Sequence, residues 1–270
     1  MAKSLTFKGK GLTSRQDVTV TIRESRPGSG VTFLLSEFGN YCKNGNEVWP
    51  RISIKAIADN VCSTVRNTAL GIDRHRVCYI EHLMCAIALC GLDNLEIQVD
   101  GAELPMGNGS SDFWVKLLQE AGMQKAIDKK IDLKETVVVT SGDKMVMAVP
   151  DQKFSASYLL DMNHPLVGRV WGSWTSDEDI SEVASARTFG PLQEHKMLGF
   201  DKDVVSFTKD GFSEELRFKD EPVRHKILDL IGDMFLCGIN PLRINARFIS
   251  IKGGHSLDVA LAKKLALALA

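Results

Sequence analysis

One segment, residues 224–235, has the periodicity of an α-helix with two chemically different faces. At 100° per residue its apolar side chains gather on one arc, which predicts that this face packs against a core. The opposite stripe is polar. His225 and Asp229 are four residues apart on it, so they project together from one turn of the predicted helix. The apolar arc carries Ile227, Leu228, Ile231, Met234 and Phe235, and the polar stripe carries His225, Asp229, Gly232 and Asp233.

Both halves of the chain repeat one order of elements. A helix opening at His82 is followed by Gly91, and a helix opening at His225 is followed by Gly238. Each glycine suits the left-handed backbone that often follows the last helical turn. An alternating strand pattern comes next in both halves, at 95–99 and 242–248.

A glycine-rich loop and a second helix complete the plan in each half. We expect a serine to cap each of these helices: Ser111 before 112–120, and Ser256 before 257–269. Further strand patterns precede the first helix of each half, at 18–22, 31–35, 135–140, 144–149 and 154–160. The sequence therefore predicts an α+β fold of two similar domains, 1–127 and 128–270, each a small sheet with helices on one face. We place the boundary in the charged stretch 125–130.

Composition narrows the class of protein. The chain has 270 residues, of which 44% are hydrophobic and 25% charged, as in globular proteins. Its 33 basic and 34 acidic residues nearly balance, so bulk electrostatics give no reason to expect a nucleic-acid partner. No run of 18 apolar residues and no amino-terminal apolar segment occurs, so we expect a cytoplasmic protein. The amphipathic end, 261–270, allows at most peripheral membrane contact.

The cysteines show no Cys-x-x-Cys pair and no regular spacing, which predicts reduced, buried thiols rather than a disulfide framework. They are Cys42, Cys62, Cys78, Cys85, Cys90 and Cys237. Two histidines, His75 and His195, sit among charged neighbours, and we expect both at the surface.

Two imidazoles and a carboxylate can together bind a catalytic metal. His225 and Asp229 would supply two ligands from one helix turn, and His82 a third, leaving a coordination position open. Glu81, beside His82, is free to accept a proton from water. If the two halves meet at these helix ends, His255 in the last glycine loop could face the metal across a cleft. Taken alone, the polar stripe also fits a solvated helix face, and His255 an exposed loop.

Four segments in one order make the set recognisable, and the pattern His-Lys-x-x-Asp-x-x-Gly-Asp at 225–233 is the most specific part. From about Phe7 to the C-terminus the chain resembles the UDP-3-O-acyl-N-acetylglucosamine deacetylase family. The segments are Glu81–Leu83, Ala186–Gly190, Arg217–Asp233 and Gly254–Leu257.

The resemblance implies a zinc-dependent hydrolase, with Fe²⁺ possible in place of Zn²⁺. It would remove acetate from the glucosamine of UDP-3-O-(3-hydroxyacyl)-N-acetylglucosamine, the committed step of lipid A biosynthesis. It also implies that the two domains pack with their helices inward, as a β-α-α-β sandwich. The expected partner is the nucleotide-sugar acyl substrate, and we expect a monomer.

The resemblance further implies a role for each matching residue. His82, His225 and Asp229 match the metal ligands, and the water on the metal attacks the amide. Glu81 matches the general base, His255 the general acid, and Asp233 the carboxylate that holds His255. Thr188 matches the hydroxyl that stabilises the oxyanion, Phe189 the ring against the sugar, and Lys226 a cation near the diphosphate.

Three departures qualify the match to the family pattern. Residues 9–15 lack the usual histidine, Asn108 replaces an aspartate, and the stretch 190–217 lacks the Leu-Gly-Gly segment that helps wall the acyl passage in the family. Acyl-chain length preference is therefore not fixed by the sequence. One alternative is a deacetylase of a different acylated amino sugar. Another is a catalytically silent nucleotide-sugar binding protein on the same scaffold.

Overall fold

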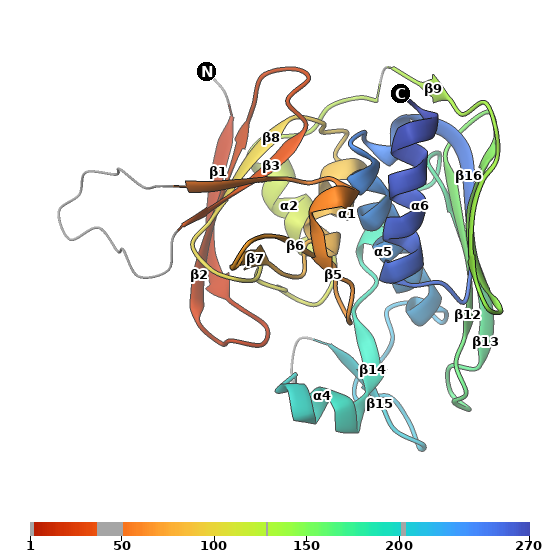
Figure 1. Ribbon diagram of the computed structural model, residues 1–270. Coiled ribbons are helices and arrows are strands. Elements are labelled where there is room, and N and C mark those ends of the chain that lie inside the picture. Colours follow the sequence, from red (N-terminus) through yellow and green to blue (C-terminus); the bar gives the residue numbers. More distant parts are fainter. Residues whose placement is uncertain (1–2, 37–50, 128, 201–203) are drawn as a thin grey trace.

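Two β-sheets form the outer layers of the molecule, and four helices lie between them (Figure 1). The computed structural model describes residues 3–36, 51–127, 129–200 and 204–270. The mixed α+β class predicted from the sequence is confirmed. The inner helices are α1 (Glu81–Leu89), α2 (Asp112–Glu120), α5 (Glu221–Met234) and α6 (His255–Ala268).

The first sheet has the strand order β1-β2-β8-β3-β4. Its inner face is apolar because alternate residues point inward, as Val18, Val20 and Ile22 do from β2. The strand patterns expected at 18–22, 31–35 and 95–99 all lie within it. Its strands are β1 (Ser4–Lys10), β2 (Asp17–Glu24), β3 (Val31–Ser36), β4 (Arg51–Lys55) and β8 (Leu95–Val99).

The second sheet, of order β10-β11-β16-β12-β13, has the same connectivity. In each sheet the central strand follows the first inner helix. This strand, β8 or β16, pairs parallel with one neighbour and antiparallel with the other. Its strands are β10 (Val137–Ser141), β11 (Lys144–Pro150), β12 (Ser155–Asp161), β13 (Arg169–Thr175) and β16 (Ile244–Ile251), with β9 (Ile131–Asp132) beside β16.

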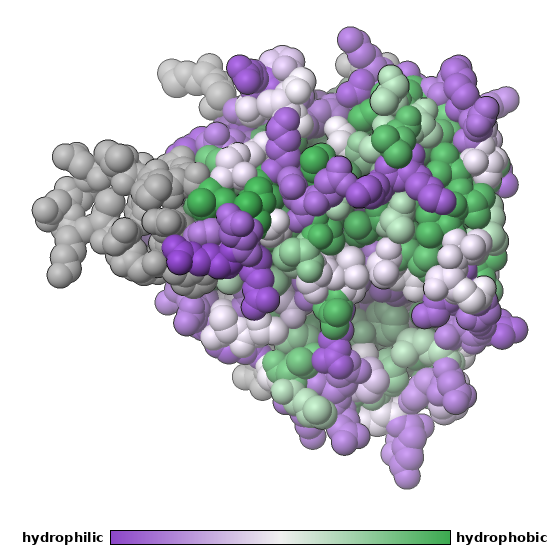
Figure 2. Space-filling model, viewed as in Figure 1, coloured by the Kyte–Doolittle hydropathy of each residue, from purple (hydrophilic) through white to green (hydrophobic). Residues whose placement is uncertain are grey.

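Smaller elements connect these layers. A projection made of β14, α4 and β15 extends from the helical layer in Figure 1, and the surface is hollowed beside it in Figure 2. The small elements are η1 (Ala58–Asn60), β5 (Val61–Ser63), β6 (Ala69–Ile72), β7 (His75–Val77), α3 (Ser181–Ala184), β14 (Phe189–Pro191), α4 (Leu192–Leu198), β15 (Val205–Phe207), η2 (Phe235–Cys237) and η3 (Pro241–Arg243).

Helices α1 and α5 pack against each other at the centre of the molecule. A Cβ atom at Gly232 would lie 2.1 Å from the backbone oxygen of Glu81, so only glycine allows this approach. One continuous hydrophobic cluster extends through both halves. None of the helices in the described residues is long and apolar enough to span a bilayer.

Glycines end the first helix of each half as predicted. Gly91 and Gly238 have φ of 68° and 88°, the left-handed conformation expected after a last helical turn. The serine caps are wrong. Ser111 does not cap α2 with its side chain, because its hydroxyl donates to the carbonyl of His82 at 2.8 Å. Helix α6 begins at His255, before Ser256.

Both histidines expected at the surface are buried. His75 lies on β7, where alternation turns it inward while Arg76 points out. His195, on α4, is 4% exposed. Cys85, Cys90 and Cys237 are free and buried as predicted, Cys78 is partly buried, but Cys62 is exposed. Cys42 lies outside the described residues.

Candidate metal centre and active site

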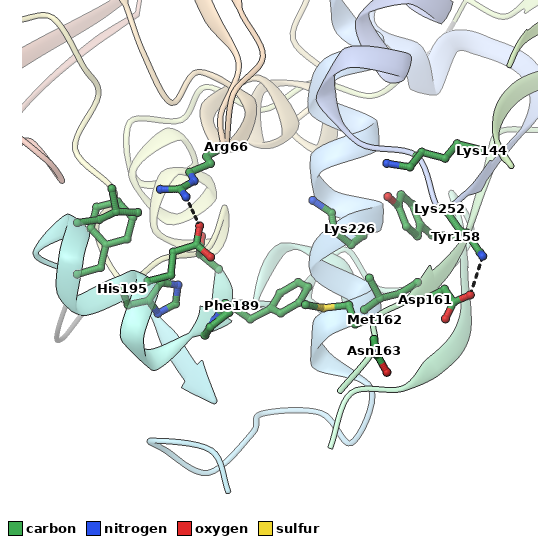
Figure 3. Close-up of a pocket in the computed structure, with 18 of the residues that line it drawn as sticks. Arg66, Lys144, Tyr158, Asp161, Met162, Asn163, Phe189, His195, Lys226 and Lys252 are labelled. Atoms are coloured by element: carbon green, nitrogen blue, oxygen red, sulfur yellow. Dashed lines mark ion pairs between the residues drawn. The ribbon is translucent and has the colours of Figure 1, made fainter. Parts of the chain in front are cut away.

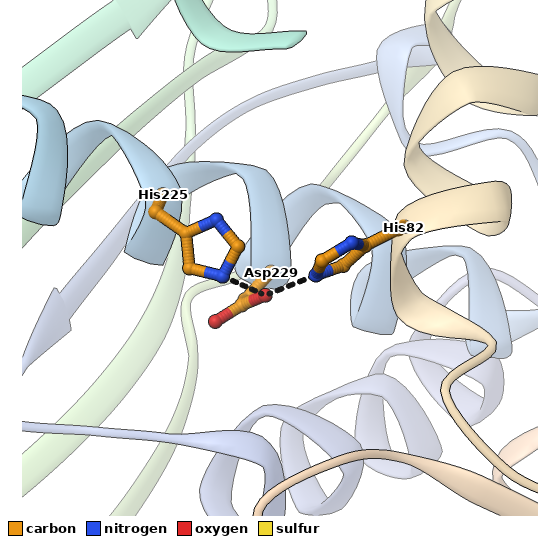
Figure 4. Close-up of side chains that lie close together, drawn as sticks. All are labelled: His82, His225 and Asp229. Atoms are coloured by element: carbon orange, nitrogen blue, oxygen red, sulfur yellow. Dashed lines mark ion pairs between the residues drawn. The ribbon is translucent and has the colours of Figure 1, made fainter. Parts of the chain in front are cut away.

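Three predicted ligands meet between α1 and α5. His82, from the first turn of α1, faces His225 and Asp229 of α5, and Figure 4 shows both rings turned toward the carboxylate. One Asp229 oxygen, Oδ1, lies 3.8 Å from His82 Nε2 and 3.5 Å from His225 Nε2. All three side chains are buried, and their candidate donor atoms lie within 4.8 Å of one another.

These spacings suit a shared divalent cation. A tetrahedral zinc ion with donors at about 2.0–2.1 Å places the donors about 3.3 Å apart, close to the observed separations. Burial also disfavours the alternative of a protonated cluster. It lowers the pKa of His82 to about 3, helped by the repulsion that charging His82 and the adjacent His225 together would cause, and burial likewise lowers the pKa of His225. Both rings are therefore neutral at pH 7, the form that binds metals.

Burial opposes ionisation of Asp229, but the cation of Lys226 and the neighbouring imidazoles hold its pKa well below the usual range. Lys226 Nζ lies 2.5 Å from Oδ2, the oxygen that does not face His82 and His225. Burial alone would lower the pKa of Lys226, yet the Asp229 carboxylate raises it. The pair therefore stays charged, and Asp229 keeps Oδ1 available as an anionic ligand.

A hydrogen bond to the backbone fixes the orientation of the His225 ring. Its Nδ1 donates to the backbone oxygen of Ala186 at 3.0 Å, which leaves Nε2 to face Asp229 and His82. His82 Nδ1 is buried and has no hydrogen-bond partner within the described residues. The two histidines therefore differ in how firmly the protein holds them.

A buried ion pair positions the carbonyl that His225 uses. The Arg187 guanidinium binds both carboxylate oxygens of Glu221, at 2.8 and 3.1 Å, and its backbone N–H also donates to Glu221. Glu221 lies in the first turn of α5, where a negative charge is favoured. The pair thus fastens the Ala186–Gly190 segment to the helix that carries His225.

Glu81 stands next to the proposed ligands. Its side chain is 3% exposed, and Oε2 accepts a hydrogen bond from the backbone N–H of Thr68 at 3.0 Å. Burial raises the pKa of Glu81 to about 8, although the charge of His255 opposes this. The carboxyl group is therefore held at a fixed orientation in a dry site, with a pKa close to neutral pH.

His255 and Asp233 form a hydrogen-bonded pair beside this cluster. His255 Nδ1 lies 2.7 Å from Asp233 Oδ2, while the Thr68 hydroxyl donates to Oδ1 at 2.6 Å. Burial disfavours the imidazolium, but the charge of Asp233 and this hydrogen bond outweigh it and raise the pKa of His255 to about 10. The ring is therefore cationic at neutral pH, with Nε2 available as a proton donor.

A cavity of about 690 Å³ opens beside these residues (Figure 3). Thr188, Phe189 and Lys226 all line it. The Phe189 ring meets His225 edge to face, with centroids 6.0 Å apart. The Thr188 hydroxyl donates to the backbone oxygen of Gly109 at 3.1 Å. The nine residues given a role by the resemblance thus lie at or beside the candidate metal centre, in the adjoining pair or on this cavity.

Sequence reasoning assigned no role to Thr68. It lies in an irregular segment with no motif, and only the fold shows that it joins Glu81 of one half to Asp233 of the other. Arg187 and Glu221 were visible inside family segments, but their pairing across 34 residues could not be read from local spacing.

Comparison with known proteins agrees with this geometry. The profile of the family described as UDP-3-O-acyl N-acetylglycosamine deacetylase matches residues 1–267. A UDP-3-O-acyl-N-acetylglucosamine deacetylase from Trichormus variabilis is 35% identical over 98% of this chain and 96% of the relative. Proteins of the same name from Syntrophotalea carbinolica and Myxococcus xanthus are 33% and 34% identical, over 97% and 98% of this chain and 85% of each relative. This chain belongs to the UDP-3-O-acyl-N-acetylglucosamine deacetylase family.

Proposed function

We propose that this protein is a zinc-dependent amide hydrolase that removes acetate from the glucosamine of UDP-3-O-(3-hydroxyacyl)-N-acetylglucosamine, a step of lipid A biosynthesis. The observation that carries the proposal is the buried cluster of His82, His225 and Asp229, with Glu81 and the His255–Asp233 pair beside it. A protein that only binds a sugar needs none of these charged, buried groups.

The donor set fits Zn²⁺, and Fe²⁺ is a second candidate for the same nitrogen and oxygen ligands. When bound, such an ion lowers the pKa of water to about 7 and polarises an amide carbonyl. His82, His225 and Asp229 would hold it.

Side chains of the protein carry out the proton transfers. Glu81 takes a proton from the attacking water, for which the Thr68 N–H holds its carboxylate in place. His255 gives a proton from Nε2 to the leaving amine, and Asp233 keeps the imidazole charged and oriented through Nδ1. Thr188 would supply a hydrogen bond to the developing oxyanion, which requires its hydroxyl to turn away from Gly109.

The cavity supports the proposed substrate. Its size is that of a site for a large organic ligand. Lys144, Lys226 and Lys252 line one side, and such cations suit a diphosphate. Phe189 offers a ring face for the sugar, and apolar side chains on the walls suit an acyl chain.

The remaining proposals concern the whole molecule. We place the boundary between the two domains at residues 127 and 128, and the repeated sheet connectivity supports this division. The protein is proposed to be a cytoplasmic monomer that touches the membrane at most peripherally, where an acylated substrate partitions.

The test is acetate release from the UDP-linked, 3-O-acylated substrate by purified protein of measured zinc content. We expect stoichiometric zinc and formation of acetate. The Glu81→Gln variant should form no acetate. Stoichiometric zinc with no acetate from any acyl length, but with acetate from another acylated amino sugar, would replace the substrate. Protein with neither zinc nor activity would be the silent binding protein.

A further inference from the structure

One buried titratable side chain on the cavity has no part in the proposed chemistry. His195, from α4, is 4% exposed and lines the cavity beside Leu198 and Phe200. Figure 3 shows it on the side of the cavity formed by α4, next to Phe189. Arg66 and Glu194 also line this wall, but they form an ion pair with each other, so they do not account for a buried polar ring beside Leu198 and Phe200.

The ring is held from its inner side. His195 Nδ1 lies 2.8 Å from the Ser206 hydroxyl on β15, and Ser206 is itself fixed because its backbone N–H donates to the Ser213 hydroxyl at 3.0 Å. Gly190 makes room for the ring, because a Cβ there would lie 2.4 Å from His195 Nε2. The imidazole therefore occupies a built position.

The second ring nitrogen of His195, Nε2, remains available for a ligand. Within the part of the chain that the structure describes, Nε2 of His195 makes no hydrogen bond, and Nδ1 is already shared with Ser206. Burial lowers the pKa of His195, so the ring is neutral at pH 7 and one nitrogen donates while the other accepts. Whichever way the Ser206 hydroxyl turns, Nε2 needs one polar partner.

The position of His195 limits what that partner can be. Phe189 contacts the metal ligand His225, Gly190 follows Phe189 on β14, and the His195 ring lies on Gly190. If Phe189 lies against the sugar, as proposed above, a group reaching Nε2 lies beyond the sugar on the α4 side of the cavity, where Leu198 and Phe200 suit an acyl chain. A hydroxyl near the carboxyl end of that chain meets both conditions, because it can donate or accept.

We propose that His195, positioned by Ser206, is a specificity-determining residue that hydrogen-bonds the hydroxyl of a 3-hydroxyacyl chain and disfavours plain acyl chains. This inference rests on the proposed function. A plain chain would bury Nε2 against hydrocarbon and leave it unpaired, which is how polar sites reject analogues that lack a hydroxyl.

The test compares two substrates of equal chain length, one with and one without the 3-hydroxyl. We expect wild-type kcat/KM to favour the hydroxylated substrate about tenfold or more, since a well-formed hydrogen bond discriminates on that scale. The His195→Leu variant should bring the ratio to about one, mainly through KM. His195→Gln, which keeps an amide donor and acceptor, should retain part of the preference. Met197→Leu, on the exposed side of α4, is the matched control and should keep the wild-type ratio.

Two results would overturn the inference: equal rates of the wild type on both substrates, or an unchanged preference in a folded, zinc-loaded His195→Leu protein. If that variant does not fold, Ser206→Ala provides the same comparison of the two substrates. It removes the hydroxyl that holds the His195 ring in place, so the preference for the hydroxylated substrate should weaken. Failure of the proposed function looks different, as neither substrate would release acetate. The affinities of the two deacetylated products, measured by calorimetry, would then still report whether His195 recognises the hydroxyl.

Discussion

Gly232 of α5 lies directly against the backbone carbonyl of Glu81 on α1, so closely that a Cβ at residue 232 would be 2.1 Å from that oxygen. The contact sets the separation of the two helices that carry the proposed metal ligands. It also explains in physical terms why a glycine stands between Asp229 and Asp233, a position that the helical pattern alone placed on a polar face.

Substituting Gly232 should separate the metal ligands. In Gly232→Ala the methyl group collides with backbone, which cannot rotate away, so we expect a loss of about 1–3 kcal/mol in the free energy of unfolding and weaker zinc binding. Urea denaturation and zinc titration measure the two effects. Gly211→Ala is the control, because nothing lies within 4 Å of a Cβ there. Wild-type zinc affinity in Gly232→Ala would show that the close approach is unimportant for the site.

Metal binding should stabilise the fold, because the ligands come from both central helices. Removing the metal with a chelator should lower Tm and abolish activity, and added Zn²⁺ should restore both. A ligand at about 1,000 times its Kd adds about 4 kcal/mol. Asp229→Ala should lose this response, whereas Asp143→Ala, a largely exposed carboxylate near the cavity rim, should keep it. A zinc-independent Tm in the wild type would contradict the assignment.

His255 should contribute to turnover without holding the metal. Replacing it with alanine removes the proposed proton donor, so we expect kcat to fall by about 10²–10⁴-fold with the zinc content unchanged. Zinc analysis of the purified variant beside its kinetics checks both parts. Loss of zinc together with activity would mean that His255 supports the metal centre instead.

The charge of His255 also predicts how stability depends on pH. Its pKa rises from about 6.5 to about 10 on folding, so its pairing with Asp233 stabilises the protein fully below about pH 6.5. The contribution is lost as pH rises through about 10. In metal-depleted protein, the difference in unfolding free energy between the wild type and His255→Gln should therefore shrink from neutral to alkaline pH. A difference that grows over this range would rule out a cationic His255.

The buried pair of Arg187 and Glu221 should support the metal site from a distance. Arg187→Lys keeps the positive charge but loses the two-pronged contact, so we expect a loss of about 1.5–3 kcal/mol in the free energy of unfolding. Since Ala186 holds His225, zinc affinity should also fall about 10–100-fold. The matched control is Arg247→Lys at the surface, where two guanidinium N–H groups of Arg247 donate to one oxygen of Asp151. Equal effects of the two substitutions on stability and zinc affinity would show that Arg187 has no special role in supporting the metal site.

Much of the fold could be predicted because local patterns reflect it. The strand at 95–99 and the helix at 112–120 match the structure residue for residue, since burial alternates with the pleat or follows the helix turn. Strands β1 and β13 were not predicted. Both lie at sheet edges, where half-exposed positions leave little contrast between the two faces.

Some residues of the candidate site could likewise be predicted from the sequence, and others could not. His225 and Asp229 could be paired from their spacing, because a helix turn brings them together. The buried position of His195 could not be anticipated, because charged neighbours mask a side chain that turns inward from a short helix. Thr68 was invisible for another reason: its two contacts depend on tertiary packing between distant segments.

The placement of the ligands on both central helices has a consequence for the life of the enzyme. Neither half of the chain holds enough of the chemistry to work on its own, since Glu81 and His82 come from one and the other ligands and His255 from the second. A newly made or damaged molecule with only one half in order is therefore inert rather than slow. Activity reports on the integrity of the entire polypeptide.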